Sequence, residues 1–236
     1  MISIVIPAYN EEKFLGDLLQ SLTQLTGTEQ FEVIVVDNAS TDRTTAIAQS
    51  FMRALPLTVL YEPHKGRGAA RAAGFAAAQG EFIFSTDADA VVPADWIQTI
   101  IPYFSDTTVL AVTGTCRIHD SGWFRNLIFN FVQPTVMLLY RLVYGHFWLT
   151  GSNFAIRKTA YGQVGGFARG LNAMEDMELG AKINQLGRIA LTHSAAVTVS
   201  GRRFQENMWR GYFAYVSSFW QHSIRKKTTV VLDDTR

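Results

Sequence analysis

Cysteine is almost absent from this sequence, since Cys116 is the only one among 236 residues. An internal disulfide is therefore excluded, and the chain fits a reducing, cytoplasmic compartment. A net charge of either sign is also missing, because 21 Lys and Arg are balanced by 20 Asp and Glu, which leaves +1. Proteins that bind nucleic acid through its phosphates usually have a clear basic excess, so we expect no nucleic-acid partner.

Two further features are missing, a signal peptide and a long uncharged apolar run. Met1 leads into an apolar stretch with no basic segment before it. The most apolar region, residues 123–149, has only fifteen residues between Arg125 and Arg141, with Pro134 in that interval. The interval is short for a membrane span and proline kinks a helix, so we predict a kinked helix that is buried or interfacial.

What is present is a regular alternation of strands and helices in the first half. Short apolar runs rich in β-branched and aromatic residues predict buried strands at 2–7, 31–37, 57–62 and 81–87. The intervening segments have the apolar spacing or the alanine content of helices, at 11–25, at 44–54 and up to Gly80. Strands joined by helices imply right-handed crossovers, so we predict an α/β fold with a doubly wound, mainly parallel sheet and flanking helices.

The second half is less regular. We predict strands at 109–118 and 195–200, a loop with a short strand and a Gly-rich turn at 151–167, and a helix at 174–189. Residues 205–236 combine aromatic residues at helical spacing with a basic end, which predicts a C-terminal amphipathic helix. This helix rests either on anionic lipid or on protein, in the second case its own domain or a homodimer partner.

Polar residues stand where the predicted parallel strands end. The first strand is followed by Tyr9 and Glu11, the second ends at Asp37, and the fourth is followed by Asp87 and Asp89. Ligands of open α/β sheets bind outside these carboxyl ends, so we interpret the three aspartates as functional. Their polar neighbours in the second turn are interpreted as turn and cap formers, namely Asn38, Ser40 and Asp42.

Asp87 and Asp89 place two like charges beside a buried strand, which is costly unless a positive charge lies between them. Two carboxylates two positions apart can turn to the same side of the chain. Their hard oxygens suit Mg²⁺ or Mn²⁺, with substrate phosphates as further ligands. We therefore predict a divalent metal that holds a diphosphate.

The segment 64–74 looks superficially like a phosphate-binding loop. It lacks the Gly-Lys-Ser/Thr ending and follows the third strand rather than the first, so neither an ATPase loop nor a dinucleotide fingerprint is predicted. We interpret its alanines as close packing of a helix on the sheet. Arg67 and Arg71 lie near the start of that helix and are candidates for contacting a nucleotide diphosphate.

Glu175 and Asp176 open the last predicted helix, and the residues alone leave two interpretations open. Acidic residues complement the positive end of a helix dipole without any further function. A carboxylate at the rim of the sheet also suits a general base.

Seven motifs follow one another along residues 1–204: SIVIPAYNEEKFLGDLLQSL, VIVVDNASTDRT, GRGAARAAG, STDADAVVPADWI, GSNFAIRKTAYGQVGGF, EDMELGAKINQLGRI and SGRRF. Together they resemble a family 2 glycosyltransferase of the GT-A fold. The resemblance implies one GT-A domain over 1–204, with a nucleotide-binding half at 1–100 and an acceptor half at 101–204, and an extension at 205–236. It also implies transfer of a sugar from a UDP- or GDP-sugar, with inversion at the anomeric carbon.

The resemblance assigns roles to single residues as well. Asp176 matches the catalytic base, and Asp89 and Asp87 match the metal ligands, with Asp87 nearer the ribose. His193 is a further metal candidate, although a lone histidine is more often structural. The remaining matches are Pro7, Ala8, Tyr9, Glu11, Asp37, Arg202 and Arg203 on the donor side, and Gly151, Ser152, Asn153 and Glu175 on the acceptor side.

The chain departs from the processive relatives, which carry a Q-x-x-R-W signature. The nearest stretch, residues 205–209, reads QENMW and lacks the arginine, so we expect one sugar to be added per encounter. We expect an acceptor hydroxyl or phosphate, on a lipid-linked acceptor if the aromatic segments contact the inner face of the membrane. Two rival functions are an inactive membrane-docked scaffold and a nucleotidyltransferase, which usually has a Gly-rich loop where this chain has PAYNEE.

Overall fold

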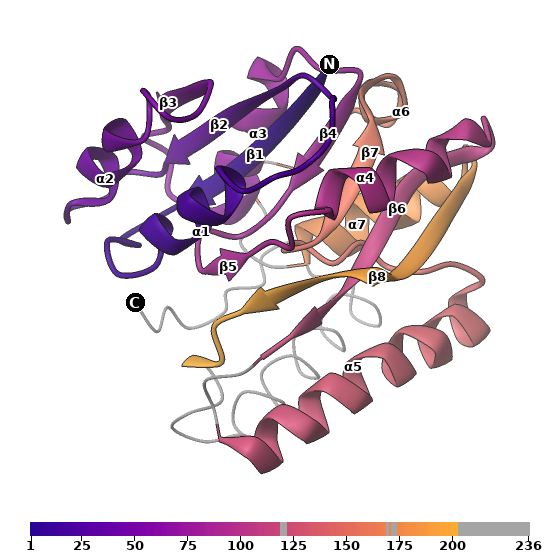
Figure 1. Ribbon diagram of the computed structural model, residues 1–236. Coiled ribbons are helices and arrows are strands. Elements are labelled where there is room, and N and C mark those ends of the chain that lie inside the picture. Colours follow the sequence, from indigo (N-terminus) through magenta and orange to yellow (C-terminus); the bar gives the residue numbers. More distant parts are fainter. Residues whose placement is uncertain (119–121, 169, 171–173, 203–236) are drawn as a thin grey trace.

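Figure 1 shows the computed structural model, which describes residues 1–118, 122–168, 170 and 174–202. Its centre is one eight-stranded sheet in the order β3-β2-β1-β4-β7-β6-β8-β5. The strands are β1 (Ile2–Ala8), β2 (Phe31–Asp37), β3 (Leu57–Tyr61), β4 (Phe82–Ser85), β5 (Ala90–Val91), β6 (Val109–Arg117), β7 (Phe154–Arg157) and β8 (Arg188–Val199). The predicted α/β class is confirmed.

The sheet is mainly parallel, as predicted. Strand β1 pairs in parallel with β2 and β4, β2 with β3, and β6 with β8. Strand β7 is antiparallel to both of its neighbours, β4 and β6, and β5 is antiparallel to β8. Because β7 lies between β4 and β6, it joins the strands of the first half of the chain to those of the second.

Helices cover both faces of the sheet. One core contains residues of α1 (Leu15–Leu22), α2 (Thr44–Ser50) and α4 (Trp96–Ile100), which continues into a 3-10 turn at Ile101–Ser105. The other core contains residues of α3 (Arg67–Ala77), α6 (Lys158–Gln163) and α7 (Glu175–Asn184). Successive side chains of β1 alternate between the two, with Ile4 and Ile6 in the first core and Val5 in the second.

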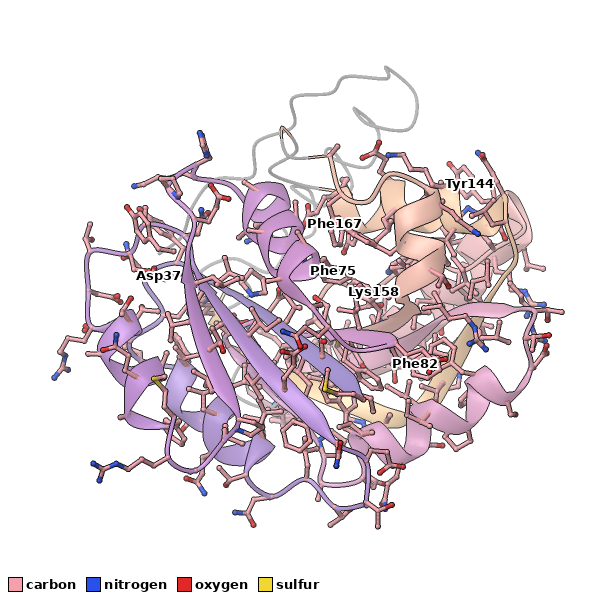
Figure 2. The ribbon with its side chains drawn as sticks, turned by 90° about the horizontal axis from the view of Figure 1, so that it is seen from above. Asp37, Phe75, Phe82, Tyr144, Lys158 and Phe167 are labelled. Atoms are coloured by element: carbon pink, nitrogen blue, oxygen red, sulfur yellow. The ribbon has the colours of Figure 1, made fainter. Side chains whose placement is uncertain are left out.

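The small residues of α3 bring this helix close to the sheet, as its alanine content predicts. A Cβ added at Gly74 would lie 2.4 Å from the side chain of Val5 and 2.8 Å from that of Val36. This close contact positions the adjacent residue, Phe75. The centre of its ring lies 5.0 Å from that of Phe167 and 6.0 Å from that of Phe154. Figure 2 shows Phe75 and Phe167 side by side between α3 and the second half of the chain. This packing fixes α3 at the rim where the site lies.

The helix α5 (Trp123–Tyr144) differs from its prediction. It runs as one continuous ribbon of 22 residues through Pro134, where a kink was expected (Figure 1). Proline removes a single backbone donor, and the Thr135 hydroxyl adds a bond to the Phe131 carbonyl at 2.9 Å. Of the two predicted environments, buried or interfacial, the buried one is wrong, since Met137 is the one buried residue within the helix. Within the described part of the chain, α5 alone has the length and composition of a membrane-crossing helix.

Several predicted boundaries are wrong. Helix α2 ends at Ser50 instead of Ala54, and α7 ends at Asn184, before Gly187. Strand β8 begins at Arg188, seven residues before the predicted start, because its polar middle interrupts the apolar pattern while its backbone still pairs with β6 around a β-bulge. The short helix α6 and strand β5 were not predicted. The predicted C-terminal helix lies outside the described residues.

Candidate functional site

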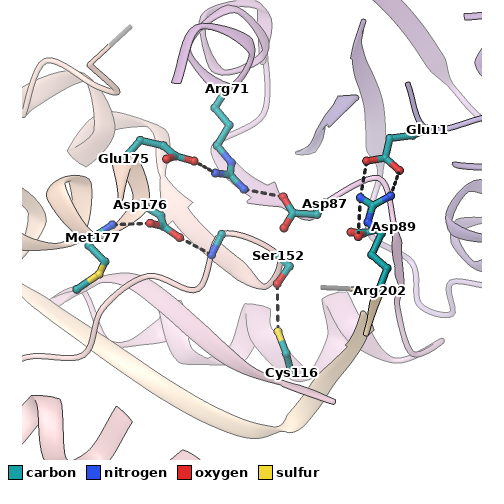
Figure 3. Close-up of polar contacts among 11 residues, drawn as sticks. Glu11, Arg71, Asp87, Asp89, Cys116, Ser152, Glu175, Asp176, Met177 and Arg202 are labelled. Atoms are coloured by element: carbon teal, nitrogen blue, oxygen red, sulfur yellow. Dashed lines mark hydrogen bonds and ion pairs between the residues drawn. The ribbon is translucent and has the colours of Figure 1, made fainter. Parts of the chain in front are cut away.

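The first group of charged residues at the rim of the sheet is centred on Arg71 of α3. Its guanidinium is almost fully buried and donates to Glu175 at the start of α7 and to Asp87 after β4, in the second case at 2.7 Å (Figure 3). Burial disfavours this charge, but Glu175, Asp87 and Asp176 together raise the pKa of Arg71 above its ordinary value. The arginine therefore ties α3, α7 and the loop after β4 into one charged unit.

Asp176 lies beside this unit, in the first turn of α7. Its carboxylate accepts hydrogen bonds from the backbone N–H of Gly151 at 2.9 Å and of Met177 at 2.8 Å (Figure 3). Burial and the neighbouring Glu175 carboxylate raise its pKa to about 6, against the opposing effect of Arg71. A carboxylate with such a pKa can take up a proton near neutral pH, which suits a general base.

Position 151 has room only for glycine, because the residue lies between two charged groups. A Cβ at this position would lie 2.6 Å from the Arg71 guanidinium and 2.9 Å from the Asp176 carboxylate. Any larger residue would displace one of them. The glycine is thus a packing requirement of the site, although its backbone N–H also orients Asp176.

Tyr140 of α5 borders the same region and was not singled out from the sequence. Its ring stacks on Tyr144 at 4.5 Å and meets Trp148 edge-on at 5.1 Å. Burial, Tyr144 and Asp176 raise its pKa to about 12, so the hydroxyl keeps its proton. The electrostatic effect of Asp176 on Tyr140 shows that the C-terminal half of α5 lies near the predicted base.

The second charged group is centred on Arg202, which follows β8. Its guanidinium donates to both carboxylate oxygens of Glu11, at 3.0 and 2.7 Å, and pairs with Asp89 at 2.9 Å (Figure 3). Burial disfavours the charge, yet Glu11 and Asp89 raise the pKa of Arg202. Two arginines therefore stand beside the D-x-D motif, Arg71 at Asp87 and Arg202 at Asp89. The sequence predicted a metal between the two carboxylates and placed these arginines at the donor diphosphate.

Several residues predicted for the donor side lie at the ends of β1 and β2. Asp37 is 6% exposed and accepts hydrogen bonds from the Ser40 backbone and the Thr45 hydroxyl. Tyr9 follows Pro7 and Ala8 of β1, and its hydroxyl accepts a hydrogen bond from the Lys65 ammonium at 3.0 Å. Lys65 was missed because its basic neighbours, Arg67 and Arg71, matched a motif and it did not.

The turn after β2 has the structural role expected for its polar residues. Asn38 donates to the carbonyls of Glu62 and His64 and accepts from the Gly66 N–H at 2.7 Å. Asp42 accepts from the Thr44 N–H at the start of α2. These bonds hold the loop before α3 against the loop after β2, so they shape the site without facing a ligand.

Two residues predicted for the acceptor side are buried. Ser152 is 8% exposed, and its hydroxyl lies 3.1 Å from the thiol of Cys116. Asn153 is fully buried, and its amide accepts from the Trp96 indole and donates to the carbonyls of Thr115 and Ala195. Its side chain therefore holds α4, β6 and β8 together beneath residues 151–153, the loop that was predicted to lie on the acceptor side.

Two predicted ligands, Arg67 and His193, belong to neither charged group. Arg67 is half-buried at the start of α3. His193 is exposed on β8, and no cluster of three or more potential metal-ligating side chains occurs among residues 1–118, 122–168, 170 and 174–202. Arg203 lies outside the described residues.

The donor atoms at the D-x-D motif nevertheless fit a divalent metal. The Asp87 side chain is 42% exposed, and only its Oδ1 is bonded to Arg71. Asp89 is 16% exposed and lies on the same rim. Two carboxylates on one rim, completed by diphosphate oxygens and water, form the donor set that Mg²⁺ and Mn²⁺ prefer.

Comparison with known proteins places this geometry in context. Residues 3–165 match the family model described as "Glycosyl transferase family 2". The probable glycosyltransferase YdaM of Bacillus subtilis is 28% identical over 211 residues, which are 84% of this chain and 50% of that protein. A beta-monoglucosyldiacylglycerol synthase of Synechocystis is 25% identical over 238 residues, 93% of this chain and 49% of that one. The chain thus spans about half the length of both relatives.

Solved structures share the fold. Staphylococcus aureus TarS 1–349 in complex with UDP-GlcNAc has a TM-score of 0.71 at 23% identity, over 85% of this chain and 58% of that chain. Mannosyltransferase PcManGT from Pyrobaculum calidifontis, in complex with GDP-Man and Mn²⁺, has a TM-score of 0.72 at 22% identity, over 95% and 64%. The predicted GT-A fold is confirmed.

Proposed function

The chain belongs to glycosyl transferase family 2, and from this premise we propose that it moves one sugar from a nucleoside diphosphate sugar to an acceptor hydroxyl or phosphate, with inversion. The observation that carries the proposal is the arrangement around Arg71. The buried guanidinium of Arg71 binds Asp87 of the predicted donor side and Glu175, the neighbour of the predicted base Asp176. Asp89 lies on the same rim and is paired with Arg202. Donor and acceptor chemistry therefore meet in one place.

The donor in this proposal is a UDP- or GDP-sugar. Support comes from the two structural neighbours, which are described in complex with UDP-GlcNAc and with GDP-Man. Pro7, Ala8, Tyr9 and Asp37 would border the nucleoside at the ends of β1 and β2, while Arg67, Arg202 and Arg203 would neutralise the diphosphate. Glu11 orients Arg202 through two hydrogen bonds, so it acts on the donor through that arginine.

Asp87 and Asp89 would hold Mg²⁺ or Mn²⁺, a choice supported by the Mn²⁺ in the PcManGT complex. A bound cation of this kind supplies Lewis-acid stabilisation of the charge that develops on the leaving diphosphate. Arg71 and Arg202 lower the repulsion between the two carboxylates before donor and metal arrive. His193, exposed on β8, is not needed for this ligand set.

Asp176 is the general base in this mechanism. It takes the proton of the acceptor hydroxyl as the hydroxyl oxygen attacks the anomeric carbon from the face opposite the diphosphate. The new carbon–oxygen bond forms as the bond to the phosphate oxygen breaks, and the nucleoside diphosphate leaves. The Gly151 and Met177 N–H groups hold the carboxylate in orientation throughout. Glu175 neutralises Arg71 and so keeps Asp176 from being fully paired with it.

For the acceptor we propose a lipid-linked molecule at the surface of a membrane. The Synechocystis relative that aligns with 93% of this chain is named for synthesis of a glucosyl diacylglycerol, which is a membrane lipid. Such an acceptor stays in the bilayer, so the enzyme would contact the membrane peripherally. The C-terminal residues Arg225, Lys226 and Lys227 would add attraction to anionic lipid.

A thermal-shift screen tests the donor and metal together. We expect UDP- or GDP-sugars to raise the melting temperature in the presence of Mn²⁺, since a ligand that binds only the folded state stabilises it. Asp89→Ala should lose the metal-dependent part of this shift, while Asp17→Ala, an exposed carboxylate on α1, should keep it. A full Mn²⁺-dependent shift in Asp89→Ala would remove Asp89 from the metal site. Nucleotide-sugar hydrolysis in the same samples would dismiss the inactive scaffold.

A further inference from the structure

Helix α5 turns its apolar side outward. The apolar side chains on its outer face recur at spacings of three, four and seven residues, which keep them on one side of a helix. Most are largely exposed; Phe131 is 73% and Leu142 is 81% exposed. The helix lies along one side of the molecule (Figure 1), and Met137 is its one buried residue in the cores. The full outward stripe consists of Phe124, Leu127, Phe131, Leu138 and Leu142. We call it the outer stripe of α5.

The side of α5 that faces the domain is polar for much of its length. Asn130 accepts a hydrogen bond from the Ile118 N–H at 3.0 Å and donates to the same residue's carbonyl. Gln133 accepts from the Cys116 N–H at 3.4 Å. Only Met137, one turn further on, is buried among apolar groups. A helix at the surface of a water-soluble domain has the opposite arrangement, with its apolar face inward.

The charge of this region fits an anionic surface. No Asp or Glu occurs between residues 107 and 174 except Asp120, and α5 itself carries Arg125 and Arg141. Aromatic residues stand at both of its ends, Trp123 at the start and Tyr144 at the finish. Aromatic rings at the ends and cations beside them are typical of segments at the boundary between lipid and water.

The helix also adjoins the acceptor side of the site. Asp176 acts electrostatically on Tyr140, and Cys116, bonded to Gln133 of α5, lies 3.1 Å from Ser152. An acceptor that enters along α5 would therefore reach the loop that orients the base.

We propose that the outer stripe of α5 inserts into the interface of an anionic bilayer and brings the acceptor side of the site to the lipid. The membrane contact stands on the exposed stripe and its charge, while the delivery of a lipid-linked acceptor rests on the proposed function. Asn130 and Gln133 tie α5 flat against β6, so the helix lies in the membrane surface and does not cross it.

The test measures partitioning of the full chain onto vesicles of equal parts phosphatidylcholine and phosphatidylglycerol. Each methylene withdrawn from lipid lowers partitioning about fourfold, so Phe131→Gln with Leu142→Gln should weaken binding at least ~10-fold. The matched control is Met52→Gln with Leu186→Gln, two apolar residues 53% and 49% exposed elsewhere, and it should bind as the wild type does. Arg141→Gln should lower binding about fivefold on these vesicles, because each cation near an anionic surface adds a similar amount to the free energy of binding.

Two outcomes would overturn the proposal. The first is equal partitioning of the stripe variant and the wild type, or no binding of either. The second is a wild-type dimer in sedimentation velocity that the stripe variant converts to monomer, with no vesicle binding, which would assign the stripe to a second copy of the chain. The donor-induced thermal shift, measured on the same samples, reports on the proposed function separately, and we expect it to be unchanged in the stripe variant.

Discussion

The guanidinium of Arg71 brings one positive charge into a buried group that holds the carboxylates of Glu175 and Asp87, with Asp176 beside them. A buried charge is tolerated only with close partners, and the loss of one partner exposes the others to the full cost of burial. Glu175 is 3% exposed and accepts a hydrogen bond from Arg71, so the loss of Arg71 would leave its carboxylate buried without this partner. The structural and the catalytic parts of the site therefore share one residue.

Arg71→Met should lower the free energy of unfolding by roughly 3–5 kcal/mol, because it leaves Glu175 buried without its counter-charge. Arg67→Met, one helical turn earlier and half-buried, is the matched control and should change it by less than about 0.5 kcal/mol. Urea denaturation at pH 7 measures both. Equal destabilisation by the two variants would show that the Arg71–Glu175 pair contributes no more than a surface residue.

Asp176→Asn keeps the shape of the side chain and removes its capacity to take a proton, so kcat should fall by ~10²–10⁴-fold while donor binding persists. In the wild type, kcat/KM should rise with pH through about 6, because only the ionised carboxylate accepts the proton. Steady-state rates across pH 5 to 8 measure both effects. Wild-type turnover by Asp176→Asn would show that Asp176 is not the general base and is only an acidic residue at the start of α7.

The raised pKa of Asp176 also makes the stability of the folded protein depend on pH. Asp176 has a folded-state pKa of about 6, above the ordinary aspartate value of 3.8, so the folded chain binds more protons than the unfolded chain between these values. Its contribution is therefore favourable at low pH and is lost as pH rises through about 6. The gain in melting temperature of Asp176→Asn over the wild type should be larger at pH 7.5 than at pH 4.5.

At the scale of elements, three segments meet at the side chain of Asn153. The amide bonds the indole of Trp96 in α4 and the carbonyls of Thr115 in β6 and Ala195 in β8. Gly114 leaves the space for it, since a Cβ there would lie 2.1 Å from the Asn153 amide nitrogen. The acceptor loop thus sits on a fixed base.

Asn153→Ala should lower the free energy of unfolding by about 3 kcal/mol or more, because it leaves an indole donor and two carbonyls buried without partners. Asn184→Ala, at the exposed end of α7, is the matched control and should be nearly neutral. Chemical denaturation followed by tryptophan fluorescence reports on both. A neutral Asn153→Ala would mean that water replaces the lost bonds.

The elements that the sequence predicts well are those whose apolar runs are uninterrupted. The strand at 31–37 is confirmed at both ends, because FEVIVVD has an unbroken β-branched run, Val33 to Val36, before its final carboxylate. Strand β8 was predicted too short because Thr192, His193 and Ser194 break the pattern at a bulge. The exposure of α5 was not predictable, since periodicity shows which residues share a face but not what lies against that face.

At the scale of the whole molecule, the site depends on contacts between distant parts of the sequence. Motifs located Asp87, Asp89 and Asp176, but the partners of the arginines came only from the fold. Arg71 and Glu175 are 104 residues apart, and Arg202 and Glu11 are 191 apart. Local pattern carries no information on which carboxylate faces which cation, so the sequence predicted a metal where two arginines also stand.

The antiparallel strand β7 has a consequence for how the protein is made. During synthesis on the ribosome, β1 to β4 emerge first and can pair among themselves, but the far side of β4 has no neighbour until Phe154–Arg157 has been translated. Strand β6 likewise waits for β8 at residues 188–199. The nascent chain therefore carries an open strand edge, the feature by which growing chains associate with one another. Completion of the sheet coincides with closure of the catalytic rim, so a chain that stalls early has neither.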